Sequence, residues 1–359
     1  MPVEIESNEG EITRVASRLW SLDMALASRN EQNKIEPGFP LRAAYMIYGY
    51  EHVGKSTLSY YLAARVRAQG EVDVVDLEGL DKRYVKGVFN IGGFDGKVKI
   101  IPMIDKETGK LRMDAEMLEE LADRMLEHEV ISAGVFDSIS SFASTQEREG
   151  EMGEAFMGRR AFDLGQFYRR VLRPLRASEK PKALFVVNHK YQKMGGMGHT
   201  TAGGQTPRNL SAIILHIQLD SFDELPDGRN ITISRGEVKK LRFGGPGGLF
   251  RFAIVPNVGI HIGLTAMYDC IEEKLADRGT TLKLKGKSLG RISKLFDAAM
   301  EGKDSVFEPF EEALLKHTKG VILCQDEKEA SATPKTHTSH SRGSQRTSRV
   351  RAGSRSTKR

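Results

Sequence analysis

Short apolar runs separated by longer amphipathic stretches set the pattern of this chain. Most of these runs are apolar at nearly every position, which is typical of parallel strands buried on both faces of a sheet. Between two of them, residues 114–128 place Met117, Leu118, Leu121 and Met125 on one face of a helix. This alternation predicts an α/β fold with a mostly parallel central sheet flanked by helices. The predicted strands are 45–49, 72–78, 98–104, 130–137, 183–189, 211–219, 230–235 and 249–255.

The two ends of the chain depart from this central pattern. Residues 9–28 carry apolar residues three and four positions apart, which predicts a helix with Ile12, Val15, Leu19, Leu22 and Leu26 on one face. Residues 264–320 predict small, mostly helical segments, and Pro, Thr, Ser, His and Arg dominate from about 331. The predicted organisation is an N-terminal helix and candidate oligomerisation element in 1–30, a core in 31–262, a small C-terminal α/β domain in 263–330 and a basic disordered tail in 331–359.

Charge and cysteine content narrow the class of protein. The formal net charge is +6, but residues 331–359 hold eight Lys and Arg and no acid, so subtracting the tail leaves −2 for the rest. Any nucleic-acid site in the body therefore rests on local residues and not on overall basicity. Two cysteines, Cys270 and Cys324, fit a reducing cytoplasm. No basic–apolar leader or membrane-spanning run is visible, so we expect a soluble cytoplasmic protein without a membrane partner.

The strand at 45–49 runs into the pattern Gly-x-x-x-x-Gly-Lys-Ser and then into an apolar helix. In such a loop the glycines turn backbone N–H groups toward a polyphosphate, Lys55 places a charge on its oxygens, and the Ser56 hydroxyl can ligate Mg²⁺. The order of strand, loop and helix is the one that this chemistry needs. The candidate phosphate-binding residues are Gly49, Tyr50, Glu51, His52, Val53, Gly54, Lys55, Ser56 and Thr57.

Two carboxylates close apolar strands. Glu78 ends the run that starts at Val72, and at the C-terminal edge of a parallel sheet it would face the terminal phosphate and act on the attacking water. A surface glutamate at a strand end is the alternative. Asp137 ends the run from Val130 in a Walker B pattern, which presents a carboxylate to Mg²⁺. An apolar strand that ends in Asp is common and is a weak signal alone. The phosphate-binding loop upstream makes the Walker B interpretation of this strand the favoured one, because the fold needs one such strand.

Polar residues follow two later strands. His189 ends the strand at 183–189, where an ordinary strand-end histidine is the alternative to a functional one. The next stretch, 190–205, is rich in Gly, Met, Thr and Lys without periodicity, which predicts a mobile loop. Residues 235–242 predict a basic connection between strands, containing Lys239, Lys240 and Arg242, with a merely exposed basic turn as the alternative.

From roughly residue 21 to 330 the chain resembles RecA-type strand-exchange recombinases. The resemblance rests on Glu78-Gly-Leu-Asp81-Lys-Arg-Tyr84, on Arg148-Glu-Gly-Glu-Met-Gly-Glu-Ala-Phe-Met-Gly158, on Phe185-Val-Val-Asn188-His189 and on Thr200-Thr-Ala-Gly203-Gly204. The second of these is the most specific, because it closely resembles the family's first DNA-binding loop and directly follows the Walker B strand, as in the family.

The resemblance implies roles for individual residues. Glu78 would be the catalytic carboxylate, Tyr84 would pack against the adenine of ATP, and His189 would sense the γ-phosphate and move a second DNA-binding loop. Lys239 and Lys240, or equally Arg242, would reach the ATP of a neighbouring subunit. The implied DNA-binding residues are Arg148, Glu149, Gly150, Met157, Gly158, Lys190, Lys193, Met194, Met197, Thr200, Thr201, Gly203 and Gly204.

Three features depart from bacterial RecA. His189 stands where the family has Gln, as in phage recombinases of the UvsX type, and a ring N–H can donate to phosphate as an amide can. The segment before Ser21 is shorter than the family's polymerisation segment, which leaves the subunit interface undefined. The tail at 331–359 is basic where bacterial RecA is acidic. Such a tail could capture DNA or remain solvated.

The sequence therefore predicts a DNA-dependent ATPase that uses ATP and Mg²⁺, forms a helical homo-oligomer on single-stranded DNA and pairs it with homologous double-stranded DNA. Single-strand-binding or mediator proteins are expected partners. One alternative is a RecA-fold ring motor of the replicative-helicase kind. The other is a DNA-binding regulatory paralogue of a recombinase with little turnover. The presence of Lys55, Glu78 and Asp137 together argues against this second alternative.

Overall fold

The structure, a computed structural model, describes residues 13–30, 34–144, 146–147, 158–192, 198–225, 227–279 and 281–331. Residues up to Thr318 form one compact unit, and residues from Lys319 onward belong to a second. Among the described residues, no helix combines the length and apolarity that crossing a membrane requires.

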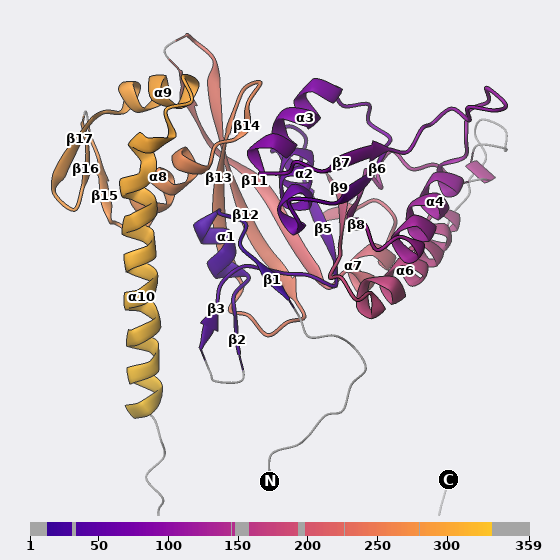
Figure 1. The fold of residues 1–359 in the computed structure, drawn as a ribbon, viewed down its shortest axis with the longest axis horizontal. Coiled ribbons are helices and arrows are strands. Elements are labelled where there is room, and N and C mark those ends of the chain that lie inside the picture. Colours follow the sequence, from indigo (N-terminus) through magenta and orange to yellow (C-terminus); the bar gives the residue numbers. More distant parts are fainter. Residues whose placement is uncertain are drawn as a thin grey trace, which may run out of the picture. The chain divides into compact units, whose positions relative to one another are not determined.

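A large mixed sheet forms the centre of the first unit (Figure 1). Within the described residues it has ten strands in the order β14-β13-β12-β11-β5-β9-β8-β6-β7, with β10 paired to β9. The six strands from β11 to β7 run parallel, and β12, β13 and β14 extend the sheet antiparallel. The expected mostly parallel sheet is confirmed. The bounds are β5 Ala43–Gly49, β6 Glu71–Asp76, β7 Lys97–Ile100, β8 Ile131–Asp137, β9 Ala183–Gln192, β10 His199–Thr201, β11 Ile213–Glu224, β12 Asn230–Leu241, β13 Gly248–Val255 and β14 Gly259–Ile260.

Helices cover both faces of the parallel strands. Successive residues of β5 point to opposite sides, so that Tyr45 and Ile47 join one buried cluster while Ala44 joins another. Helix α2 packs in the first cluster, and α4 and α6 pack in the second. Burial on both sides explains why most residues of central strands such as β5 and β9 are apolar. The helices are α2 Lys55–Val66, α3 Lys82–Ile91, α4 Asp114–Glu127, α6 Arg159–Ala177 and α7 Thr206–Leu210.

The N-terminal segment is not the continuous helix that its spacing predicted, and that expectation is wrong. Among the described residues of this segment, only Trp20–Ala25 (α1) is helical, while Arg14–Val15 (β1) pairs with Phe39–Pro40 (β4). The chain turns at Arg18, whose φ is 66°, and the Asp23 carboxylate accepts the backbone N–H groups of Ser17 and Arg18. Ile12 lies outside the described residues. The remaining short strands are β2 Ser28–Arg29, β3 Ile35–Glu36 and β4 Phe39–Pro40.

The region after the large sheet contains more strand than expected. Strands β15, β16 and β17 pair antiparallel between α8 and α9, where mostly helical segments were predicted. Helix α8 packs on β13, and the proposed boundary at residue 262 stays a prediction. The tail at 332–359 lies outside the described residues. The bounds are α8 Ile262–Glu272, β15 Ala276–Arg278, β16 Thr281–Leu284, β17 Lys287–Arg291, α9 Ile292–Met300, a 3₁₀ turn Asp304–Phe307 and α10 Glu308–Ser331.

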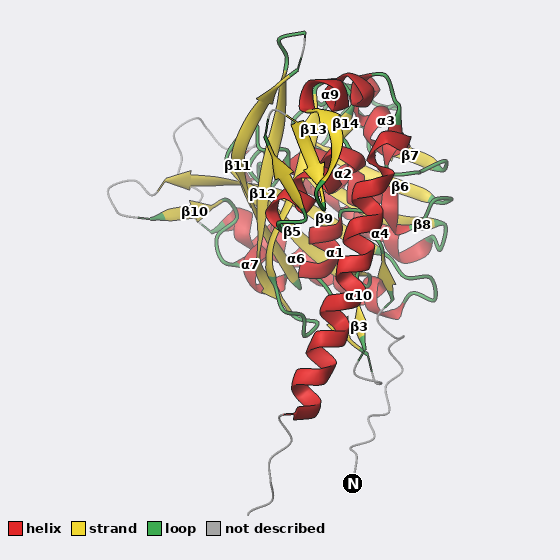
Figure 2. Cartoon of the chain, turned by 90° about the vertical axis from the view of Figure 1, so that its left-hand side faces the viewer, coloured by secondary structure: helices red, strands yellow, loops and turns green. Residues whose placement is uncertain are grey.

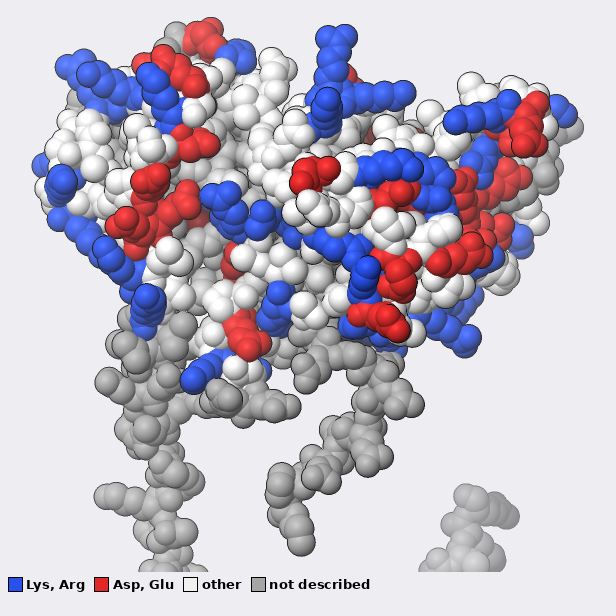
Figure 3. Space-filling view, viewed as in Figure 1, with Lys and Arg blue, Asp and Glu red and all other residues white. Residues whose placement is uncertain are grey.

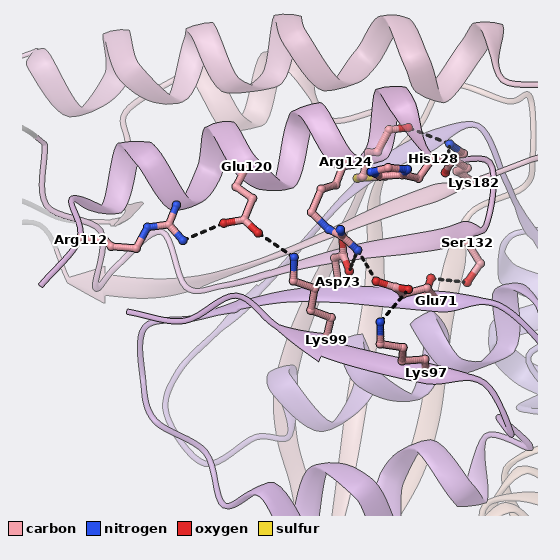
Figure 4. Close-up of polar contacts among 11 residues, drawn as sticks. Glu71, Asp73, Lys97, Lys99, Arg112, Glu120, Arg124, His128, Ser132 and Lys182 are labelled. Carbon is pink, nitrogen blue, oxygen red and sulfur yellow. Dashed lines mark hydrogen bonds and ion pairs between the residues drawn. The ribbon is translucent and has the colours of Figure 1, made fainter. Parts of the chain in front are cut away.

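A charged cluster fastens α4 to β6 (Figure 4). The Arg124 guanidinium donates from Nε to Oδ2 of the fully buried Asp73 at 2.6 Å and also contacts Glu71. Burial raises the pKa of Asp73, while Arg124 opposes this shift. Because a buried carboxylate without a partner is strongly unfavourable, Arg124 is a structural requirement of this face of the sheet.

Basic and acidic side chains are interspersed over the face seen in Figure 3. This agrees with the near-zero charge of the chain without its tail. Sites for anions on this face therefore depend on a few local groups.

Candidate functional site

The carboxyl ends of the parallel strands bring the sequence-predicted residues together. The pairing of β5 with β9 places Gly49 beside His189, and the pairing of β6 with β8 places Asp76 beside Asp137. A cavity of about 560 Å³ opens at this edge and is lined in part by Lys55, Ser56, Thr57, Glu78 and His189. Residues from four separate stretches of sequence thus share one site.

The phosphate-binding loop is fixed by its glycines. Gly54 precedes α2 with φ +83°, a conformation that residues with a Cβ rarely adopt. A Cβ at Gly49 would lie 2.1 Å from the carbonyl oxygen of Ile217 on β11, so only glycine allows this approach. Lys55 is buried, its Nζ donates to the carbonyl oxygen of Tyr50 at 2.6 Å, and desolvation lowers its pKa. The loop therefore offers a compact cation and the N-terminus of α2 to an anionic ligand.

Glu78 lies in a tight turn just after β6. The Asp76 carboxylate accepts the N–H groups of Glu78 and Gly79 at 3.0 and 2.9 Å, which orients the turn. The Glu78 carboxylate in turn contacts His189, with 3.0 Å between Oε1 and Nε2, and the hydroxyl of Ser138. The hydrogen bond from His189 is the main cause that lowers the pKa of Glu78 to about 2. Glu78 is thus ionised at neutral pH, so His189 carries the proton on Nε2 and donates it.

Asp137 ends β8 and is fully buried. Among the described residues, neither of its carboxylate oxygens has a partner in hydrogen-bond geometry. The Ser56 hydroxyl is near enough to favour the charged form, but burial dominates and raises the pKa of Asp137 to about 7. A hard oxygen ligand without a partner beside a serine hydroxyl and a phosphate-binding loop fits a Mg²⁺ ion that also binds the phosphates.

Tyr84 does not line the cavity. It is half-buried on α3, and its hydroxyl and that of Thr57 are 2.7 Å apart. Its ring packs against the apolar cluster beneath α2. The structure therefore places Tyr84 beside the phosphate-binding helix, fixed through its hydroxyl.

The stretch at 190–205 is not the continuous loop that its composition predicted. Strand β9 runs on to Gln192, and β10 pairs back onto it with Thr201 opposite Lys190, forming a hairpin that projects from the sheet (Figure 2). Thr200 also lies in β10, and Gly203 and Gly204 follow with φ +76° and +66°. Gly158 begins α6 with φ 88°. Arg148, Glu149, Gly150, Met157, Lys193, Met194 and Met197 lie outside the described residues.

The predicted basic connection is also wrong in form, because Lys239 and Lys240 lie within strand β12. Lys239 pairs with Glu237 at 2.6 Å, and Lys240 donates to the carbonyl oxygens of Arg208 and Asn209 at 2.8 and 3.0 Å. Arg242 follows the strand and also donates to the Asn209 carbonyl. None of the three lines the cavity of its own chain.

Sequence reasoning missed the serines that hold the site. Ser138 contacts Glu78, and Ser140 Oγ accepts the backbone N–H of His189 at 2.9 Å. Their position directly after Asp137, in the run Ser138-Ile-Ser140-Ser141, was the available signal. The Asn188 amide was missed as well, and it donates to the carbonyl oxygen of Ala202 at 3.0 Å, joining the middle of β9 to the segment after β10.

Comparison with known proteins agrees with this geometry. A sequence model described as the RecA N-terminal domain matches residues 5–242. The chain belongs to the RecA family. It is 27% identical over 293 residues to Protein RecA of Francisella philomiragia, with 78% of this chain and 74% of that one covered. It is 28% identical over 295 residues to Protein RecA of Francisella tularensis subsp. novicida, at the same coverage.

Protein RecA of a Nocardioides species is 28% identical over 210 residues, covering 57% of this chain and 55% of that one. The match to the RecA family includes the phosphate-binding loop, both carboxylates, His189 and the β9–β10 hairpin. The resemblance expected from the motifs and the RecA-like core are thereby confirmed.

Proposed function

We propose that this RecA-family chain is a DNA-dependent ATPase that forms filaments on single-stranded DNA and promotes homologous pairing and strand exchange with double-stranded DNA. The observation that carries the proposal is the convergence of Lys55, Ser56, Glu78, Asp137 and His189 at one sheet edge. Hydrolysis of ATP to ADP and phosphate takes place there. We expect the protein to act in the cytoplasm, together with single-strand-binding or mediator proteins.

The loop from Gly49 to Thr57 binds the phosphates of ATP. Its backbone N–H groups face the phosphate oxygens. Lys55 contributes a positive charge that is already desolvated because the side chain is buried. Ser56 and Asp137 are the residues that would hold Mg²⁺. The ion, when bound, neutralises phosphate charge that builds up in phosphoryl transfer. Tyr84, held by Thr57, flanks the base.

Glu78 orients the attacking water and accepts its proton. Its pKa of about 2 keeps Glu78 ionised at every physiological pH, and loss of the His189 hydrogen bond that lowers this pKa would make it a stronger base. The same carboxylate is bonded to His189, whose Nε2–H is also the group expected to meet the γ-phosphate. When the Nε2–H group of His189 donates to the γ-phosphate instead of to Glu78, the Glu78 carboxylate is free to bind water. The contact of His189 with the γ-phosphate and the activation of Glu78 as the catalytic base then occur together.

The segments 148–158 and 190–205 bind DNA in this proposal. Backbone N–H groups, Arg148, Lys190 and Lys193 face the phosphates, and Met157, Met194 and Met197 wedge between bases. The Asn188 bond to Ala202 and the β9–β10 pairing tie the second segment to His189. A bound γ-phosphate thus orders the second segment through His189, and hydrolysis of ATP removes that order.

A neighbouring subunit completes the site. Lys239, Lys240 and Arg242 are the candidate cations, and their placement on and just after an antiparallel strand outside their own cavity supports a role toward another subunit's ATP. Turnover then depends on assembly.

The proposal is tested by electron microscopy with single-stranded DNA and a slowly hydrolysed ATP analogue. The wild-type chain should form helical filaments, Lys55→Ala should form none while keeping a cooperative thermal transition, and the exposed Lys86→Ala on α3 should behave like wild type. Normal filaments in Lys55→Ala would remove the role given to Lys55. Closed rings in the wild type would favour a ring motor.

A further inference from the structure

The side chain of Tyr50 leaves the phosphate-binding loop and reaches the β9–β10 hairpin. Its hydroxyl lies 3.0 Å from Nδ1 of His199, the first residue of β10, and the two rings meet edge-on at 5.8 Å. Lys190 of β9 sits over the Tyr50 ring, with Nζ 5.1 Å from the ring centroid. One aromatic side chain therefore touches both strands of the hairpin.

The stacked pair of His216 and Tyr48 contacts Lys190 and so supports its position over Tyr50. His216 of β11 stacks on Tyr48 at 4.7 Å, and its Nε2 lies 3.2 Å from Nζ of Lys190. Burial, followed by the charge of Lys190, lowers the pKa of His216 to about 4, so His216 is neutral and accepts a hydrogen bond from the ammonium. Lys190 is thus held between His216 and Tyr50.

The Tyr50 peptide is also bonded to the lysine of the phosphate-binding loop. Lys55 Nζ donates to the Tyr50 carbonyl oxygen at 2.6 Å. A phosphate oxygen at Lys55 competes for that ammonium. Gly49 packs closely against the backbone of Ile217, so the loop cannot move much before Tyr50. A change of backbone conformation on phosphate binding therefore occurs at Tyr50 and the residues after it.

We propose that the contact of Tyr50 with His199 couples phosphate binding at Lys55 to the position of the β9–β10 hairpin, with His199 as a positioning residue for DNA binding. The inference rests on the proposed function, because it assumes that the hairpin binds DNA in a nucleotide-dependent way. It is separate from the contact of His189 with Glu78, which involves neither His199 nor the Tyr50 side chain. The nucleotide site thus has two side-chain contacts with the same hairpin, one from Glu78 and one from Tyr50 of the phosphate-binding loop.

The test measures how far a non-hydrolysable ATP analogue tightens binding of a fluorescent oligothymidylate, expressed as the ratio of dissociation constants without and with the analogue. The variants are His199→Ala, Tyr50→Phe and the double substitution. Lys86→Ala is the control, because Lys86 is exposed on α3 and belongs to neither the cavity nor the hairpin. Affinity for a fluorescent ADP and the thermal transition are recorded for every variant.

A net hydrogen bond of about 1 kcal/mol corresponds to about a five-fold change in the ratio. We expect each single substitution to lower the ratio about five-fold, the double substitution to lower it no further, and Lys86→Ala to keep it. An unchanged ratio in His199→Ala, or single effects that multiply in the double variant, would overturn the coupling. Equal weakening with and without nucleotide would make His199 a simple DNA contact and would also overturn it.

The proposed function fails in a different way. If the wild-type chain binds the oligothymidylate equally with and without the nucleotide analogue, the nucleotide-dependent DNA binding itself is wrong. If the wild type responds and the variants respond equally, only the coupling through Tyr50 and His199 is wrong.

Discussion

The Nε2 atom of His189 and the Oε1 atom of Glu78 lie 3.0 Å apart, although 111 positions separate the two residues in the chain. The parallel pairing of β5, β9, β8 and β6 creates this contact by bringing the ends of the strands to one edge. The contact joins the residue expected to sense the γ-phosphate to the residue expected to act on water. Much of the site's behaviour follows from this pair.

The substitution Glu78→Gln should keep ATP and DNA binding but lower turnover by about 10²- to 10⁴-fold, because an amide cannot accept the proton of the attacking water. Steady-state phosphate release with saturating single-stranded DNA measures the effect. Glu127→Gln on the exposed end of α4 is the control. Turnover at the wild-type rate in Glu78→Gln would assign the base to another residue.

Two substitutions at His189 should separate hydrogen bonding from ring chemistry. His189→Gln retains an N–H donor for Glu78 and phosphate, so its DNA-stimulated turnover should stay within about ten-fold of wild type, equivalent to about 1.4 kcal/mol. His189→Ala removes the donor and should lose stimulation by DNA. Equal loss in both variants would show that the histidine ring itself is required, contrary to the donor role.

The buried carboxyl group of Asp137 should make stability depend on pH. Its pKa is raised to about 7 in the folded chain, above the ordinary value of 3.8, so the folded state holds the proton more tightly. The free energy of unfolding therefore falls as pH rises between about 4 and about 7, by a few kcal/mol at most because one pKa unit is about 1.4 kcal/mol.

Asp137→Asn removes this dependence and should also abolish Mg²⁺-dependent turnover. Denaturation of both proteins at pH 5 and pH 8 without Mg²⁺ measures the effect, and the variant should lose less stability on going to pH 8. Asp269 has a pKa raised to about 7 as well, so the difference between the two proteins isolates Asp137. Identical pH dependence would contradict the assignment.

Arg124→Ala should destabilise the fold by about 3–5 kcal/mol, because it leaves Asp73 buried without its partner. Urea denaturation measures the loss. Lys97→Ala removes only the contact of the exposed Lys97 with Glu71, which keeps Arg124 as a partner, and should cost less than about 1 kcal/mol. Combining Arg124→Met with Asp73→Val should restore much of the stability, and a double variant as unstable as Arg124→Ala would argue against an unpaired charge as the cause.

The parts predictable from sequence are those with local signals. The phosphate-binding loop is specified by Gly49, Gly54 and Lys55 in consecutive order, and the strands that end at Asp137 and His189 show as apolar runs. Because parallel strands present their carboxyl ends at one edge, the approximate assembly of the site follows. The exact partners of Glu78 do not follow, since Ser138 reaches it only after two strands have paired.

The errors arose where distant contacts override local spacing. Val15 fits a helical period but pairs with Phe39, and Asp23 stabilises the turn at Arg18. The segment with Lys239 and Lys240 reads as a basic turn, yet it pairs with β11 across the sheet. The β9–β10 hairpin likewise depends on the pairing of 190–192 with 199–201, which the Gly- and Met-rich composition between these two short segments does not reveal.

The most direct test of a recombinase whose active sites are completed between subunits is ATP turnover with and without single-stranded DNA over a range of protein concentrations. The account predicts strong stimulation by DNA that rises cooperatively with concentration, as assembly brings neighbouring cations to each ATP. Turnover that is independent of DNA and proportional to protein concentration would contradict it, leaving an ATPase of the RecA family without the proposed recombinase activity.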